Sequence, residues 1–381
     1  MKKRPIQSST SPIAMLGLLP ALSLALAGCG EADLGPAPLT EEALAAVAEN
    51  AGAPRDQLAR QVDEVFTAEG VGETRAVLVM HAGEIAAERY APGYDADTRH
   101  VSWSMAKTVT AVMIGMLVAD GRLRLDDSPP IPLWQRAGDA RGEITLRQLL
   151  QMRSGLRHTE AGSVPYESSE VRMLFLDGRD DMAKFATEQP LEAEVGQQFE
   201  YSSNTTVILA DIAARALTDS SDPDERRRAV TDYLETRLFG PLGMDSMVPE
   251  FDAAGTMVGG SLIHGTTRDW AKFGEFLRHG GSVRGAQLIP RKWIDFMRTP
   301  SPRSEFYGGQ TWLNRASGID RDEAQPDVGP ETMFAAIGHM GQYVIVSPDQ
   351  KLTVVRLGHS DQVERPKMLR ELLDIVELYP E

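Results

Sequence analysis

The stretch from Val101 to Asp120 constrains the fold most, because it attaches a polar pair of side chains to a long apolar helix pattern. Gly121 follows the last apolar residue and can end a helix in the left-handed conformation. The pattern therefore predicts a buried helix with Ser104 in, or next to, its first turn. The apolar residues that recur at helical spacing are Met105, Val109, Val112, Met113, Met116 and Leu117.

Ser104 and Lys107 form a Ser-x-x-Lys pair at the start of this helix. Residues three apart lie on one helix face, so the Lys107 ammonium can reach the Ser104 hydroxyl. A serine becomes nucleophilic when a neighbour removes its proton, and a lysine can do this once desolvation or nearby cations lower its pKa. The alternative is that Ser104 caps a core helix. Since Ser-x-x-Lys often arises by chance, these two residues alone favour that alternative.

Length and charge limit the classes of function. The chain has 381 residues, 42% of them hydrophobic, which suffices for one large domain or two lobes. A net charge of −16 without a basic stripe argues against a nucleic-acid partner. The sequence contains no Gly-x-Ser-x-Gly elbow, His-Glu-x-x-His zinc motif, phosphate loop or dinucleotide fingerprint. We therefore expect neither a metal nor a cofactor.

The N-terminus resembles an export signal. Lys2, Lys3 and Arg4 precede an apolar run, 13–26, that is too short for a comfortable membrane span. The run ends in Leu26-Ala-Gly-Cys29, which resembles a bacterial lipobox. That resemblance implies that residues 1–28 are a lipoprotein signal peptide and that Cys29 is lipid-modified; the alternative is a plain secretory signal.

Cys29 is the only cysteine, so no thiol remains for disulfides, metal clusters or catalysis. Residues 29–55 are rich in Ala, Glu, Gly and Pro and are expected to form a flexible tether. We thus expect an exported protein that its lipid holds on a membrane, facing the periplasm or the cell surface.

The order of predicted elements indicates an α+β fold. Strands occur near both ends of the chain and helices lie between them, which favours one antiparallel sheet built from both termini with an inserted helical lobe. We assign residues 56–130 and 251–381 to the lobe with the sheet and 131–250 to the helical lobe. Strands are predicted at 76–81, 84–90, 332–337, 342–346 and 352–357, and helices at 56–68, 146–152, 205–217, 222–238, 266–277, 290–297 and 366–378.

Two further segments carry candidate chemistry. Tyr201 precedes the helix at 205–217, and a phenol can act as acid or base where cations lower its pKa. Alone, Tyr201 is more typical of a half-buried tyrosine bonded to a carbonyl. His339 lies in Gly338-His-Met-Gly341 between two predicted strands, where glycines allow close approach by a ligand. A structural role and a site role for His339 are about equally supported.

In order and spacing, Ser104-x-x-Lys107, Tyr201-Ser-Ser203 and His339-Met-Gly341 resemble the motifs of the serine β-lactamase and penicillin-binding-protein superfamily, on its class C side. Within it the chain is most similar to family VIII carboxylesterases and 6-aminohexanoate-dimer hydrolases. Several matching phrases in the right order are specific enough to outweigh the plainer interpretation of Ser104. The resemblance implies a β-lactamase/transpeptidase-like fold with its site between two lobes. Other matching phrases are Ile144-Thr-Leu-Arg-Gln-Leu-Leu, Met152-Arg-Ser-Gly-Leu156, Phe239-Gly-Pro-Leu-Gly-Met244 and Val258-Gly-Gly260.

The resemblance also implies roles. Ser104 would be the nucleophile of an acyl-enzyme, and Lys107 with Tyr201 would move its proton as base and then acid. The backbone N–H groups of Ser104 and Gln342 would form the oxyanion hole. Ser203, His339 and Gly341 would bind the substrate.

Two departures bear on the substrate. Ser203 stands where β-lactamases usually have asparagine, and His339 stands where they and the peptidases have a lysine that receives the substrate carboxylate. Because histidine is mostly neutral at pH 7, both changes favour small esters or amides without that carboxylate. We expect a metal-independent serine hydrolase. The alternatives are a weak β-lactamase or D-amino-acid peptidase, and a catalytically silent ligand-binding module on the same fold.

Overall fold

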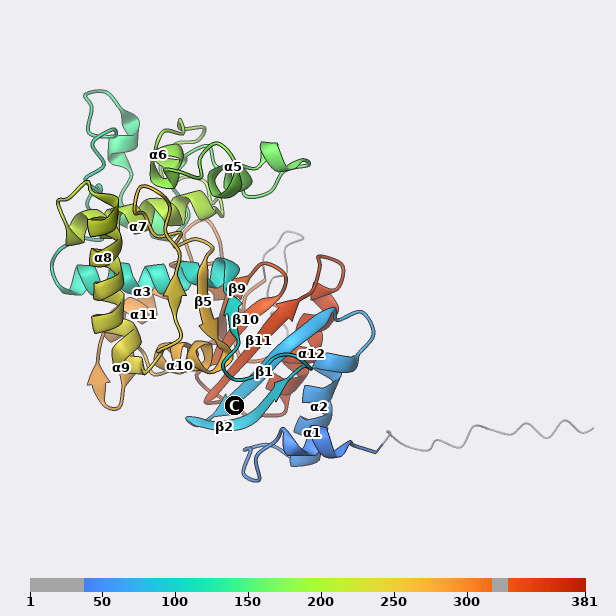
Figure 1. Ribbon diagram of the computed structural model, residues 1–381. Coiled ribbons are helices and arrows are strands. Elements are labelled where there is room, and N and C mark those ends of the chain that lie inside the picture. Colours follow the sequence, from blue (N-terminus) through green and yellow to red (C-terminus); the bar gives the residue numbers. More distant parts are fainter. Residues whose placement is uncertain (1–37, 317–327) are drawn as a thin grey trace, which may run out of the picture. The chain divides into compact units, whose positions relative to one another are not determined.

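A six-stranded antiparallel sheet forms the centre of the compact unit Leu39–Glu381 in the computed structural model, which describes residues 38–316 and 328–381 (Figure 1). Residues from both ends of this unit contribute strands, in the order β2-β1-β11-β10-β9-β8. The predicted α+β class is therefore confirmed. The strands are β1 (Glu73–His81), β2 (Glu84–Tyr90), β8 (Trp312–Leu313), β9 (Phe334–Gly338), β10 (Gln342–Ser347) and β11 (Leu352–His359).

Both faces of the sheet are buried, because its central strands carry apolar residues at consecutive positions. In β1, Val77 and Val79 join the cluster beneath α2 (Arg55–Thr67) and α12 (Arg365–Glu377). Ala76 and Leu78 point the other way into the larger cluster, against α10 (Thr267–Arg278). Figure 1 shows α2 and α12 on the opposite side of the sheet from α10.

The helical region packs around α3 (Ala106–Ala119) and α7 (Ser203–Leu217). Residues 106–117 of α3 are all buried, so this helix is a core element rather than an amphipathic surface helix. The Ser202 side chain caps α7 by accepting a hydrogen bond from the Thr205 N–H. The other helices here are α4 (Leu146–Leu150), α5 (Ser169–Phe175), α6 (Met182–Thr187) and α8 (Pro223–Leu234), with short turns η2 (Ala140–Glu143), η3 (Pro165–Glu167) and η4 (Glu235–Phe239) and α9 (Gly240–Leu242).

A second, three-stranded sheet connects the two regions and was not predicted. Its strands are two to four residues long, too short for an alternating pattern to show in the sequence. They are β3 (Arg99–Val101), β5 (Ile263–Thr266) and β4 (Val248–Pro249). The remaining elements are the hairpin β6 (Ser282–Val283) and β7 (Ala286–Gln287), and helix α11 (Arg291–Met297).

The predicted tether is too long. Residues 38–54 include α1 (Glu41–Ala45) and pack on the domain, with Ala43, Val47 and Ala51 buried. The Tyr379 hydroxyl donates to the Ala51 carbonyl, which ties this segment to the C-terminus. An Ala-rich composition does not distinguish a flexible tether from a segment that packs on an apolar surface of the domain. Residues 1–28, Cys29 and the first part of the tether lie outside the described residues.

None of the helices within residues 38–316 and 328–381 is long and apolar enough to cross a membrane.

Candidate active site

Ser104 lies in a short 3-10 turn, η1 (Trp103–Met105), that leads directly into α3. The turn is fixed at its entrance, because Ser102 N–H donates to the Ile263 carbonyl and Ser102 Oγ accepts from the Ile263 N–H. Trp103 has a φ of 46°, a left-handed conformation that costs a non-glycine residue about 1–2 kcal/mol. The sharp turn places Ser104 in the wall of a cavity. The prediction that Ser104 adjoins the first turn of a buried helix is confirmed.

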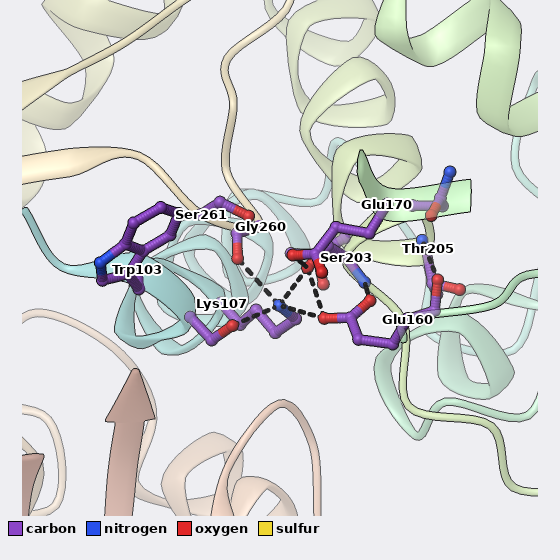
Figure 2. A network of polar contacts seen from close by, with 12 residues as sticks. Trp103, Lys107, Glu160, Glu170, Ser203, Thr205, Gly260 and Ser261 are labelled. Carbon is purple, nitrogen blue, oxygen red and sulfur yellow. Dashed lines mark hydrogen bonds and ion pairs between the residues drawn. The ribbon is translucent and has the colours of Figure 1, made fainter. Parts of the chain in front are cut away.

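Lys107 reaches Ser104, as the motif spacing predicts. Its Nζ is 2.9 Å from Ser104 Oγ, 2.7 Å from Ser203 Oγ and 2.8 Å from the Gly260 carbonyl oxygen. The side chain is 1% exposed, so these contacts replace water (Figure 2). From α3, Lys107 therefore connects Ser104 to Ser203 at the start of α7 and to Gly260, which precedes β5.

Two glutamates complete this network, and neither was predicted. Glu160 Oε1 is 3.6 Å from Lys107 Nζ and 2.7 Å from Ser203 Oγ. Glu170 Oε1, at the start of α5, is 2.8 Å from the same hydroxyl (Figure 2). Burial and the neighbouring Glu160 raise the pKa of Glu170 to about 8, while Lys107 opposes the shift. Both glutamates lie in a loop-rich stretch without periodicity, where they look like ordinary solvated carboxylates.

Tyr201 lies beside Lys107, in the loop before α7. Lys107 Nζ is 4.7 Å from the centroid of the Tyr201 ring, close enough for a cation–π contact. The ring packs at 5.6 Å from Tyr307 and 5.1 Å from Trp312, and Tyr201 is 6% exposed. The structure thus brings together Ser104, Lys107, Tyr201 and Ser203, four of the predicted site residues.

The cavity beside Ser104 has a volume of about 1080 Å³. Acidic, aromatic and aliphatic side chains contribute to its walls, so it can hold a substrate with both polar and apolar parts. Helix α5 contributes the apolar Val171, Leu174 and Phe175 together with Glu170, whereas η1 and β9 contribute Ser104 and His339. Its lining residues include Trp103, Ser104, Glu160, Glu170, Leu174, Phe175, Tyr201, Trp312, Gly338, His339, Tyr343 and Arg365.

His339 lines this cavity, as predicted. Its ring meets the Trp103 ring edge-on, with centroids 5.3 Å apart. Burial lowers the pKa of His339, and the nearby Arg365 guanidinium lowers it further. His339 is therefore neutral at pH 7 and does not supply the fixed positive charge of the lysine that it replaces.

The roles predicted for Gly341 and for the Gln342 backbone N–H stay predictions. Neither residue is among those lining the cavity, and the Gln342 amide donates to the carbonyls of His339, Met340 and Gly358. The hairpin register sets Gln342 opposite Gly338, so this side chain closes the turn between β9 and β10.

The strand edge that faces Ser104 belongs to β9. Strand β8 pairs only with Phe334 and Ala335, so the last three residues of β9 have no strand on that side. There Gly338 approaches η1 so closely that a Cβ would lie 2.2 Å from the Ser102 carbonyl oxygen. The backbone N–H groups near Gly338 and His339 are therefore further candidates to donate to a substrate.

No group of three or more His, Cys, Asp or Glu side chains within the described residues is arranged to hold a metal ion.

The sequence profile of the β-lactamase family matches residues 55–377, which span the sheet, the helical region and the whole candidate site. The chain belongs to the β-lactamase family. It is 26% identical over 234 residues to a 6-aminohexanoate-dimer hydrolase of Paenarthrobacter ureafaciens. That match covers 58% of this chain and 56% of the enzyme, so the chain matches little more than half of that relative's length.

Solved structures show the same fold. A family VIII carboxylesterase superposes with a TM-score of 0.58 at 16% identity, covering 84% of this chain and 96% of that one. A penicillin-binding-protein homologue from Caulobacter crescentus superposes with a TM-score of 0.57 at 18% identity, covering 86% and 98%. Family members with these descriptions include hydrolases of different substrates, so the substrate must be argued from the site itself.

Proposed function

We propose that this β-lactamase-family protein is a serine hydrolase that cleaves an ester or amide bond through an acyl-enzyme on Ser104. The observation that carries the proposal is the 2.9 Å contact between Lys107 Nζ and Ser104 Oγ in the wall of a large cavity. A lysine buried to 1% exposure has lost the water that favours its charged form, which suits it to accept a serine proton.

The reaction would proceed in two halves. Ser104 Oγ attacks the substrate carbonyl while Lys107 takes the hydroxyl proton, and collapse of the tetrahedral intermediate releases an alcohol or amine that takes up that proton, with Tyr201 as the proposed acid. Water then attacks the acyl-enzyme, gives a proton back to Ser104 and releases the carboxylic acid. Backbone N–H groups at Ser104 and at the β9 edge would stabilise the oxyanion, an effect worth roughly a hundredfold or more in rate.

Two features support a substrate without the carboxylate that β-lactams present. His339 is neutral where related enzymes have lysine, because its pKa is lowered. Val171, Leu174 and Phe175 of α5 line the cavity with apolar surface, which suits an aliphatic or aromatic acyl group. The names of two relatives, a 6-aminohexanoate-dimer hydrolase and a family VIII carboxylesterase, agree with amide and ester chemistry.

One observation favours the alternative of a weak β-lactamase or D-amino-acid peptidase. Arg365, at the start of α12, lines the same cavity and could attract an anionic substrate group. A catalytically silent binding module is the third possibility.

Intact-mass spectrometry separates these functions. The full-length protein in detergent is incubated with a fluorophosphonate probe and, separately, with penicillin. We expect one fluorophosphonate adduct on Ser104, no penicillin adduct, and loss of labelling in Ser104→Ala with a nearly unchanged melting temperature. Ser221→Ala, at an exposed serine, is the matched control and keeps full labelling.

A penicillin adduct would favour the lactamase or peptidase alternative. No adduct with either probe would favour the silent module, and full labelling of Ser104→Ala would refute the choice of nucleophile.

We also propose that Cys29 carries a lipid that holds the protein on a membrane. The lipobox-like Leu26-Ala-Gly-Cys29 supports this proposal.

A further inference from the structure

Three polar groups surround the Ser203 hydroxyl, and together they constrain where protons can lie. Ser203 Oγ is 2.7 Å from Lys107 Nζ, 2.7 Å from Glu160 Oε1 and 2.8 Å from Glu170 Oε1. Ser203 is fully buried, so water cannot take the place of any of these partners. Figure 2 shows the contacts converging between α3, α5 and the start of α7.

The hydroxyl has one hydrogen and two lone pairs. As the base, Lys107 directs its nitrogen lone pair at the Ser104 hydroxyl and donates an N–H to Ser203 Oγ, so it occupies one lone pair of that oxygen. The single hydrogen of Ser203 can serve only one of the two glutamates. If both were ionised, the other contact would hold two oxygen atoms together with no hydrogen between them. A proton on one glutamate removes this conflict, because that carboxyl then donates into the second lone pair.

Glu160 is the ionised member of the pair. Its Oε2 accepts the Ser203 backbone N–H at 2.6 Å while its Oε1 faces the Ser203 hydroxyl, so it binds the first residue of α7 through two donors. The N-terminus of this helix also favours a negative charge. Lys107 Nζ is 3.6 Å from the same carboxylate. This leaves Glu170 as the proton carrier.

We propose that Glu170 is protonated in the working protein and acts as a positioning residue that leaves a single negative charge, that of Glu160, beside Lys107. The catalytic part of this inference rests on the proposed function. A second carboxylate within the network would stabilise the Lys107 ammonium and remove the base that Ser104 needs.

The inference predicts a loss of reactivity at alkaline pH. Burial and Glu160 raise the pKa of Glu170 to about 8, so above that pH the proton leaves and two carboxylates face Lys107. A site that needed only a neutral lysine would instead become more reactive as the pH rises. Besides Glu160, the charged or titratable groups that line the same cavity as Glu170 are Tyr201, His339, Tyr343, Asp361 and Arg365. The elements η3 and α6, which pack against α5, carry Glu167 and the exposed Lys184.

The first test measures the rate constant for fluorophosphonate labelling of the full-length protein across pH 6 to 10. We expect the wild-type constant to be about tenfold lower at pH 9 than at pH 7, from titration of one group. Glu170→Gln, a neutral isostere, should keep the pH 7 rate within about threefold and lose the alkaline decrease. Glu167→Gln removes the same charge at an exposed position, and this control variant should still show the alkaline decrease in labelling rate.

A second test does not depend on activity. Because the pKa of Glu170 is raised in the folded state, that state holds an extra proton and wild-type stability falls as the pH rises from about 4.5 to about 8. The urea midpoint of wild type should therefore fall relative to that of Glu170→Gln over this range and level off above it.

The inference is overturned if wild type shows no alkaline decrease, if Glu170→Gln shows the same decrease, or if the two urea midpoints keep a constant difference. Failure of the proposed function would look different: no labelling at any pH, with the urea comparison still deciding the proton on Glu170.

Discussion

At the scale of single residues, the candidate site depends on how the surrounding oxygen atoms stabilise the positive charge of the buried Lys107 side chain. Its ammonium would be expensive to bury alone, and the structure surrounds it with three oxygen acceptors and the Glu160 carboxylate. This balance explains why a side chain can be almost fully buried and still hold the position that a general base requires. It also makes Lys107 and Glu160 energetically dependent on each other.

Removing one partner of this pair should cost more than removing both. Lys107→Met leaves the Glu160 carboxylate buried without its cation, which costs about 3 kcal/mol of the free energy of unfolding. Adding Glu160→Gln to that variant should recover part of the loss. Urea denaturation of the two single variants and the double variant measures the coupling.

Arg227→Met provides the control, since the Arg227–Asp224 pair is exposed at 42% and 69% and should contribute less than about 1 kcal/mol. Additive effects of Lys107→Met and Glu160→Gln would mean that the two side chains do not stabilise each other.

The motifs predicted which residues meet, but not what surrounds them. Ser104, Lys107, Tyr201 and His339 were predicted because their spacing follows the family pattern, and all four line or adjoin one cavity. Glu160 and Glu170 were missed because a carboxylate in a loop or in the first turn of a short helix has no local signature, and only tertiary contacts bury it.

At the scale of elements, Ser104 is held between two strands. The Ser102 contacts with Ile263 fix the turn η1 on one side, and β9 passes close to it on the other. Long periodic elements such as α2, α7 and α12 agree with prediction to within a few residues. The strands β3 and β5, which hold η1, were missed because so few residues form them.

The contact between β9 and η1 can be tested at Gly338. Its φ is not in the left-handed region, so alanine meets only a steric obstacle, with its Cβ 2.2 Å from the Ser102 carbonyl oxygen. Gly338→Ala must push β9 away from η1, which should lower the fluorophosphonate labelling rate by at least about tenfold and destabilise the fold by about 1–3 kcal/mol.

Gly83→Ala is the comparison, since Gly83 has a φ of 92° in the turn after β1 and no atom near its missing Cβ. It should cost about 1–2 kcal/mol of strain and leave the labelling rate unchanged. If Gly338→Ala reacts at the wild-type rate, the position of Ser104 does not depend on β9.

At the scale of the whole molecule, the folded unit begins closer to Cys29 than the sequence predicted. Five of the six strands of the large sheet and the helices on its two faces, α2, α10 and α12, could be predicted because their apolar patterns are long, whereas β8 has only two residues. The start of the domain could not, since Val47 and Ala51 are buried only by the tertiary surface formed by residues from both ends of the unit. The stretch from Cys29 to Pro38 spans at most about 30 Å, so a lipid on Cys29 would keep the protein near the membrane.

Replacing that cysteine tests the proposed anchor. Two or more acyl chains hold a protein stably on a bilayer, whereas one gives only marginal binding, so the wild type should sediment with membranes and incorporate labelled palmitate. Cys29→Ser, exported behind an ordinary secretory signal in place of residues 1–28, should remain in the soluble fraction and take up no label. Its fluorophosphonate labelling rate should equal that of wild type, because Cys29 lies before the folded unit. If Cys29→Ser still sediments with membranes, the lipid proposal is wrong and another surface of the protein binds them.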